Sequence, residues 1–138
     1  MKRIAFALAV GSVLLVMVAG LAVAQSESTS LKEERQGNVR YLSGGIGLEE
    51  RDDMDARARE FNLKLVFAMN SREYLSDVRV VLLDAGGKTV LSAESGGPWF
   101  FATLPDGVYT VHVAMGNQKE VRRLKVGRSL QTLNFLWK

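Results

Sequence analysis

From Asn62 to the C-terminus, apolar residues recur at every second position in one segment after another. In GVYTVHVAM, for example, Tyr109, Val111 and Val113 share one face. A period of two is typical of strands with one buried face, because successive side chains of a strand point to opposite sides. The segments that this pattern predicts to be strands are NLKLVFAMN, DVRVVLLD, TVLSAE, PWFFAT, GVYTVHVAM, QKEVRRLKV and SLQTLNFLW.

Glycine or proline stands at nearly every join between these segments, as in AGGK, SGGP and LPDG. Both residues favour tight turns, glycine through its freedom to adopt positive φ and proline through its fixed φ. Short strands separated by such turns at intervals of about eight to twelve residues predict an antiparallel sandwich rather than a sheet with helical crossovers. We therefore expect a mainly β fold, an antiparallel β-sandwich of about seven strands.

One helix is predicted before the sandwich, between Leu48 and Phe61. Met54, Ala58 and Phe61 recur at helical spacing and form one narrow apolar stripe. Acidic residues crowd the first turns and arginines the last, which suits the helix dipole. We expect this helix to cover one edge or end of the sandwich.

The first residues have the order of a secretory signal peptide. Lys2 and Arg3 precede an apolar stretch from Ile4 to about Val18, and Ala22-Val23-Ala24 supplies the small residues expected before a cleavage site. The alternative is an uncleaved membrane anchor, since residues 4–24 are nearly long enough to span a bilayer. We favour cleavage after Ala24 and a periplasmic or secreted protein.

This interpretation divides the chain into three parts: a signal peptide (residues 1–24), a flexible polar leader (25–38) and a single domain of one helix and the β-sandwich (39–138). The leader, QSESTSLKEERQGN, is almost free of large apolar residues.

The charge and the absence of cysteine exclude several classes of protein. Lys2 and Arg3 contribute to the formal net charge of +3, so the mature chain is close to neutral and has no footprint for nucleic acid or for an anionic membrane. With no cysteine, the domain has neither a disulfide framework nor a lipid-modified N-terminal cysteine.

The longest turn-and-strand run resembles the carboxypeptidase regulatory-like domains, which are transthyretin-like (prealbumin-like) β-sandwiches. The resemblance rests on Asp84-Ala85-Gly86-Gly87, on Phe101, on Leu104-Pro105-Asp106-Gly107 and on Tyr109-Thr110-Val111, and it covers about residues 62–126. It implies a transthyretin-like sandwich with Phe101, Leu104 and Tyr109 in its core. The chain is also similar to small exported proteobacterial proteins of unknown function, which implies an envelope location and no particular activity.

No set of residues predicts catalysis, a cofactor or a metal. His112 is the only histidine and lies within a predicted strand, so a two-histidine zinc site cannot form. Because the chain has no cysteine, a cysteine–histidine dyad is also excluded. The glycines of Ser43–Gly47 precede a helix as in a phosphate loop, but Glu49 and Glu50 would repel a phosphate there. We interpret them as a strand-to-helix turn, and the acidic residues that follow as a solvated helix face.

The aromatic run Trp99-Phe100-Phe101 is the most prominent candidate for a binding surface. Because a strand alternates faces, Trp99 and Phe101 point one way and Phe100 the other. We expect Phe101 in the sandwich core and Phe100 beneath the helix. If the helix leaves Phe100 uncovered, Phe100 and Trp99 form an exposed apolar patch for a partner or a glycan.

Two further features complete the candidate surface. Arg122 and Arg123 belong to a basic cluster on the penultimate strand, which either discourages edge-to-edge pairing or binds an anionic polymer. Gly45, in the glycine loop, is the centre of a second candidate partner-facing feature.

From these features we expect a non-catalytic interaction module that binds another envelope protein. The alternative is a carbohydrate-binding module that uses Trp99, Tyr109 or Trp137 as a stacking platform, and a hydrolase is the least favoured. Two coplanar exposed rings on one sheet face would favour sugar binding. Buried rings and a bare edge strand would favour a protein partner.

Overall fold

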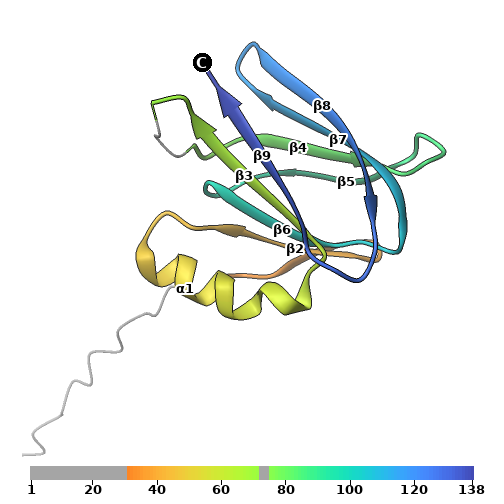
Figure 1. Cartoon of the computed structure of the whole chain (residues 1–138), viewed down its shortest axis with the longest axis horizontal. Helices are drawn as coiled ribbons and strands as arrows, with labels where there is room; N and C mark the ends of the chain where they lie inside the picture. The colour runs from red at the N-terminus through yellow and green to blue at the C-terminus, as the bar shows by residue number, and fades with distance from the viewer. Residues whose placement is uncertain (1–30, 72–74) are drawn as a thin grey trace, which may run out of the picture.

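The computed structural model describes residues 31–71 and 75–138, which fold into two sheets with a helix against the outside of one of them (Figure 1). The elements follow the chain in this order: β1 (Glu34–Gln36), β2 (Val39–Gly44), α1 (Leu48–Arg57), the 3-10 helix η1 (Ala58–Glu60), β3 (Leu63–Met69), β4 (Arg79–Leu83), β5 (Thr89–Glu94), β6 (Trp99–Thr103), β7 (Gly107–Met115), β8 (Gln118–Val126) and β9 (Gln131–Trp137).

The predicted β-sandwich is confirmed. One sheet has five strands in the order β1-β2-β6-β3-β9, and the other has four in the order β5-β4-β7-β8. Every pair is antiparallel except β3 and β9, which run parallel from Leu63↔Gln131 to Met69↔Trp137. The purely antiparallel sandwich that we expected is therefore wrong for this pair, because β9 returns to the first sheet after the β7–β8 hairpin of the second.

The core lies between the two sheets and is built from the alternating residues that the period of two singles out. On the four-stranded sheet, Tyr109, Val111 and Val113 of β7 point into it. On the five-stranded sheet, the buried residues include Leu65, Phe67, Phe100 and Phe135. The alternation of the sequence thus maps directly onto the inner faces of both sheets.

The predicted helix consists of α1 and the 3-10 turn that follows it. Met54 is completely buried, and Phe61 and Ala58 pack with it against the outer face of β2 and β6. Near the end of the helix, Arg57 forms ion pairs with Glu33, which precedes β1, and with Glu60. In an isolated helix it could pair only with residues of the helix itself. These contacts tie the helix to the sheet rather than only along its own face.

The structure exchanges the expected places of Phe100 and Phe101. Phe100 is completely buried between the sheets and stacks on Tyr41, with ring centroids 5.6 Å apart. Phe101 is the one beneath the helix, 5.6 Å from the ring of Phe61. The assignment of Phe101 to the sandwich core is therefore wrong, and Phe100 forms no part of the surface.

The expected leader is too long. Residues 34–36 form β1, an edge strand that pairs with β2, and Leu31 packs against the hydrophobic cluster under the helix. Residues 31–38 therefore belong to the domain rather than to a flexible leader. The predicted signal peptide, residues 1–24, lies outside the described residues. Within the described residues, no helix has the length and apolar character needed to cross a membrane.

Candidate functional site

The candidate aromatic platform is largely occupied by the protein itself. The Trp99 ring is half-buried on the outer face of the five-stranded sheet, where the Lys64 ammonium lies 3.8 Å from the ring centroid and the Arg51 guanidinium 5.8 Å from it. The other two rings proposed for sugar stacking, Tyr109 and Trp137, are both buried. No two of these three rings are open on one sheet face.

The glycine loop before α1 is filled by a side chain of the helix that follows it. The Glu50 carboxylate accepts hydrogen bonds from the backbone N–H groups of Gly45 and Ile46, at 3.0 and 3.1 Å. It therefore occupies the place that an anion bound by the N–H groups of this loop would take. Gly45 has φ +90°, and a Cβ there would lie 3.2 Å from the Trp99 ring, so this glycine is required by the turn.

The basic cluster on β8 divides into an inward and an outward part. Arg122 points toward the gap between the sheets, where it donates a 2.6 Å hydrogen bond to the backbone oxygen of Asn134 in β9. Its guanidinium also lies 4.4 Å from the Phe135 ring centroid and bonds to Glu120. Arg122 therefore closes the open side of the sandwich between β8 and β9, and its guanidinium is bonded to groups of the protein itself.

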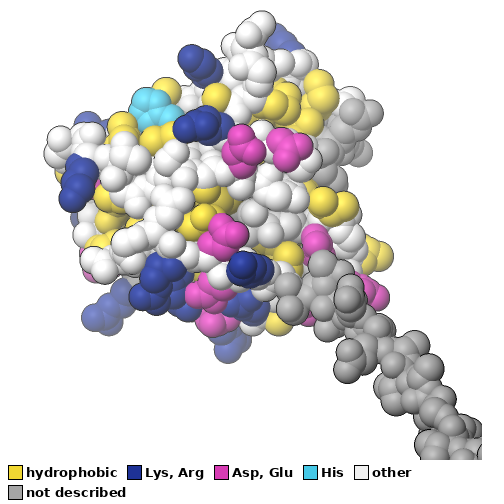
Figure 2. Space-filling view, turned by 180° about the vertical axis from the view of Figure 1, so that it is seen from behind, with side chains coloured by type: hydrophobic (Ala, Val, Ile, Leu, Met, Phe, Trp, Pro, Cys, Tyr) yellow, Lys and Arg dark blue, Asp and Glu magenta, His cyan; other side chains and the backbone are white. Residues whose placement is uncertain are grey.

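Arg123 points outward, as does every second residue of β8 counted from Lys119. These side chains are all exposed on the outer face of the four-stranded sheet: Lys119, Val121, Arg123 and Lys125. Val121 retains 57% of its exposed area, which is unusual for a valine in a strand. In Figure 2, the histidine side chain lies among hydrophobic and basic side chains on one face of the molecule.

The peptide groups of these same residues point to the free edge of β8. Gly116-Asn117 joins β7 to β8 as a two-residue hairpin loop, with φ +57° at Gly116 and Met115 opposite Gln118. In such a hairpin the flanking pair is hydrogen-bonded and the next pair is not. Alternate residues from Lys119 onward therefore turn their N–H and C=O groups away from β7, and β8 is the last strand of its sheet.

The opposite side of the sandwich gives the same parity independently. Ser92 of β5 turns both its peptide groups to the edge, where the Gln36 side chain binds them. Residues Ser92, Val81, His112 and Val121 lie opposite one another in a row across the sheet, and successive pairs in this row must alternate between non-hydrogen-bonded and hydrogen-bonded. Since the Ser92–Val81 pair is not hydrogen-bonded, the Val81–His112 pair is, and the His112–Val121 pair is not. The peptide groups of Val121 therefore face the free edge.

Gln36 is a structural feature that sequence reasoning missed. Its amide donates to the Ser92 oxygen at 2.6 Å and accepts from the Ser92 nitrogen at 3.0 Å, as a neighbouring strand would. We expected this residue in the leader because the segment is polar. The signal that would have found it is the Gly37-Asn38 pair directly before the Val39 strand, which is a hairpin loop.

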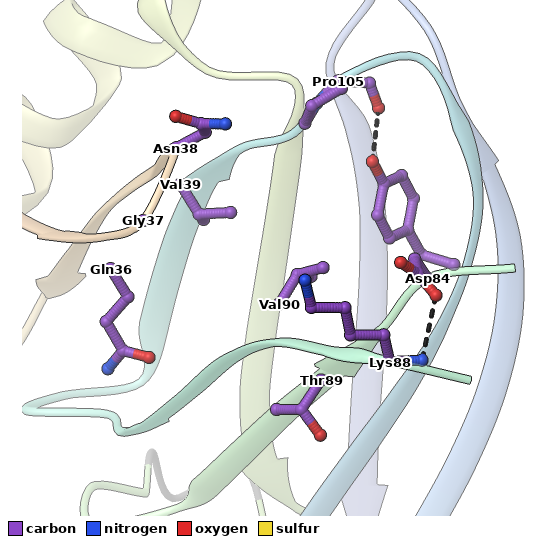
Figure 3. A pocket seen from close by; sticks show the side chains of 10 residues that line it. Gln36, Gly37, Asn38, Val39, Asp84, Lys88, Thr89, Val90 and Pro105 are labelled. Atoms are coloured by element: carbon purple, nitrogen blue, oxygen red, sulfur yellow. Dashed lines mark hydrogen bonds between the residues drawn. The ribbon is translucent and has the colours of Figure 1, made fainter. Parts of the chain in front are cut away.

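A pocket of about 450 Å³ opens at the end of the sandwich beside Gln36 (Figure 3). It lies between the β1–β2 turn, the β4–β5 turn and the corner that precedes β7. Its apolar wall contains Val39, Val90 and the Tyr109 ring, and the hydroxyl of Tyr109 donates a 2.7 Å bond to the Pro105 oxygen. Polar side chains surround the opening: Gln36, Asn38, Asp84, Lys88 and Thr89.

Burial raises the pKa of Tyr109 above its ordinary value of 10.0, and the negative charges of Asp84 and Asp106 raise it further. The pKa of Tyr41 is also raised, first by the hydrogen bond that its hydroxyl donates to Glu34 and then by burial. Both phenols therefore stay protonated near neutral pH.

His112 lies half-buried in the middle of β7, on the outer face of its sheet. In residues 31–71 and 75–138, no group of three or more histidine and acidic side chains is arranged to hold a metal ion.

A scan against protein-family models gives no match to this chain, and no curated protein is significantly similar to it.

Proposed function

We propose that this chain is an exported, non-catalytic interaction module whose β8 edge binds an extended, acidic segment of another envelope protein. The observation that carries the proposal is the free edge of β8, nine residues long, with a basic outer face. The resemblance to carboxypeptidase regulatory-like domains supports it, because those sandwiches typically serve as accessory modules. The segment at residues 1–24 supports export as a signal peptide.

Two requirements of β-strand addition are present at this edge. The N–H and C=O groups of Lys119, Val121, Arg123 and Lys125 face the edge and have no partner strand among the described residues, so they can form a new ladder with an incoming strand. The side chains of the same four residues all lie on one face of β8, so the side chains on one face of a partner strand would lie beside them.

The charge of this row selects the partner. Lys119, Arg123 and Lys125 form no ion pair within the described part of the chain, so their positive charges are not neutralised internally. A strand with acidic side chains opposite them would gain from each pair, whereas a second copy of β8 would bring like charges together. The edge is therefore suited to another protein and resists pairing with itself.

The alternative function, carbohydrate binding on surface aromatics, has less support from the geometry. Tyr109 and Trp137 are buried, and Lys64 lies over the ring of Trp99. A sugar would have to displace that ammonium before it could stack. The hydrolase alternative has no residue set in the described part of the chain that would carry it.

The test uses residues 25–138 with an affinity tag in envelope extract, followed by crosslinking and mass spectrometry. The native protein is compared with a triple variant, Lys119→Glu, Arg123→Glu and Lys125→Glu. A matched control, Lys32→Glu, Arg59→Glu and Arg128→Glu, makes the same change in charge at exposed positions outside the β8 row. We expect a partner that the native protein and the control retain and the β8 variant loses, with crosslinks at Lys119 or Lys125.

Two further readouts separate strand addition from simple charge attraction. Hydrogen exchange should slow at the amides of Val121 and Arg123 when the partner binds, because the new ladder protects them. Binding should also weaken as the salt concentration rises. A partner that the β8 variant retains, or retention of the protein on peptidoglycan with no protein partner, would overturn the proposal.

A further inference from the structure

The pocket at the end of the sandwich combines fixed walls with free polar groups. Three bonding arrangements hold its walls. The Gln36 amide is clamped to Ser92, and the Tyr109 hydroxyl is bonded to Pro105. The Asp84 Oδ1 accepts hydrogen bonds from the backbone nitrogens of Gly86 and Lys88, at 3.0 and 2.9 Å. A pocket held in this way needs little reorganisation when a ligand enters.

Several polar groups at the opening remain without a partner among the described residues. They are the Lys88 ammonium, the Asn38 amide, the Thr89 hydroxyl and the second oxygen of Asp84. Figure 3 shows the Lys88 side chain extending across the pocket toward Val90, with Gln36 and Asn38 on the other side. These groups come from two separate turns, β1–β2 and β4–β5, and meet around one space.

The combination of these groups selects a class of ligand. An anion would meet the Asp84 carboxylate, and a cation would meet the Lys88 ammonium. A purely apolar ligand would cover polar groups without bonding to them, which costs free energy. A neutral molecule with several hydroxyls fits best, because each hydroxyl both donates to an oxygen and accepts from an N–H group.

The size and the apolar wall agree with this class. A volume of about 450 Å³ is within the range of small-molecule sites. The C–H face of a sugar ring could lie against Val39, Val90 and the edge of Tyr109 while its hydroxyls reach the polar rim. This mode depends on hydrogen bonding inside a pocket and needs no exposed stacking platform.

We propose that this pocket is a binding site for a neutral, hydroxyl-rich small molecule of mono- or disaccharide size. The site is separate from the β8 edge, since no residue of β8 lines it. Ligand binding in this pocket is therefore independent of protein binding at the β8 edge.

The experiment is a titration of ¹⁵N-labelled residues 25–138 with glucose, N-acetylglucosamine and maltose, followed by two-dimensional NMR. Acetate and glycine serve as charged probes. We expect at least one of the saccharides to give saturable shifts confined to the amides of residues 36–39, 84–90 and 106–109. The charged probes should give none there.

Two variants test the residues and one controls for them. Lys88→Ala and Asn38→Ala remove exposed side chains but keep the backbone bonds of their turns, so both should fold. Each should weaken binding about tenfold, the loss expected when one hydrogen bond to a ligand disappears. Arg123→Ala, on β8, should leave the affinity unchanged.

Three results would overturn the proposal: no saturable shift with any of the three saccharides, saturable shifts only with acetate or glycine, or saccharide shifts that both pocket variants leave unchanged.

Discussion

The two open sides of this sandwich are closed by single side chains, but in different ways. On one side, β1 of the five-stranded sheet lies near β5 of the four-stranded sheet, and the neutral amide of Gln36 satisfies both backbone groups of Ser92. On the other side, Arg122 of β8 satisfies one backbone oxygen of β9 and covers the Phe135 ring.

The two sides therefore differ in whether the outer strand of the four-stranded sheet can pair with a further strand. The Gln36 amide, the neutral clamp, occupies the peptide groups of Ser92 in the middle of the β5 edge, so a further strand could not pair there without displacing it. Arg122, the charged clamp, bonds to the β9 edge and not to the edge of its own strand. It leaves β8 with free peptide groups and an outward row of basic side chains, which repel a second copy and attract an acidic strand.

The largest expected effect comes from removing the charges of the β8 row. The triple variant Lys119→Thr, Arg123→Thr and Lys125→Thr keeps strand-forming side chains but removes the repulsion between copies. It should self-associate at a concentration where the native protein stays monomeric, as measured by analytical ultracentrifugation.

The control for this change is Lys32→Thr, Arg59→Thr and Arg128→Thr, which removes the same charge at exposed positions outside the β8 row. The control should remain as monomeric as the native protein. If the β8 variant also remains monomeric, the basic row does not protect the edge and the contrast between the two sides is lost.

The next effect is on stability, at the neutral clamp. Gln36→Ala removes two partly buried hydrogen bonds and should lower the free energy of unfolding by about 1–2 kcal/mol. Gln36→Glu keeps the acceptor for Ser92 N–H but places a carboxylate against the Ser92 oxygen, so it should be at least as destabilising at neutral pH. Chemical denaturation measures both.

Gln118→Ala is the matched control, because the exposed Gln118 amide makes one long bond of 3.3 Å to Lys138. It should change stability by less than about 0.5 kcal/mol. An equal loss in Gln36→Ala and Gln118→Ala would mean that the β5 edge does not depend on the clamp.

A smaller loss is expected at the charged clamp. The Arg122 side chain keeps 39% of its exposed area, so water screens its interactions. Arg122→Ala should cost about 1 kcal/mol from the lost bond to β9 and the lost cover of Phe135. Arg122→Lys keeps the charge but cannot bond to Asn134 and Glu120 with the same planar fork, so it should recover only part of that loss. Full recovery by lysine would show that charge alone closes this side.

The sequence predicted the layers of this fold better than its edges. The period of two identifies which residues share a face, and a buried face must pack on something, so the sandwich and its covering helix follow. The order of strands within a sheet depends on contacts between distant segments. The sequence therefore could not show that β8 is an edge or that β9 returns parallel to β3.

The exchange of Phe100 and Phe101 has the same origin. Alternation shows that the two rings point to opposite faces, but it does not show which face is the inner one. The pairing of β6 with β2 decides that, because Leu42 lies opposite Phe101 beneath the helix, and Ser43 lies opposite Phe100. Two aromatic residues of equal size give the sequence no means of choosing.

The two halves of the candidate surface differ in the same way. Arg122 and Arg123 are neighbours in sequence with equal charge, and only the register of β8 against β7 assigns one to the closed gap and the other to the open face. Gln36 was missed because its role depends on Ser92, which is distant in sequence.

The smallest expected effect is a dependence of stability on alkaline pH, and it belongs to the β1 side. The Tyr41 hydroxyl donates a hydrogen bond to Glu34 of β1, and Tyr109 lines the pocket beside Gln36. The pKa of both phenols is raised in the folded state. Between the unfolded and folded pKa values the native state holds more protons than the unfolded state, so the free energy of unfolding falls as pH rises. The stabilisation is complete below the ordinary value of 10.0 and is lost above it.

Denaturation measured at a series of pH values around and above 10 checks this, with Tyr41→Phe and Tyr109→Phe as the variants. Phenylalanine does not ionise, so each variant should flatten the decline of stability with pH. Hydrogen exchange should show that the amides of β1 and the β4–β5 turn open before those of β8 and β9, because both ionising groups lie on the first side. If the double variant declines as steeply as the native protein, ionisation elsewhere governs the alkaline limit and the two sides do not differ in this respect.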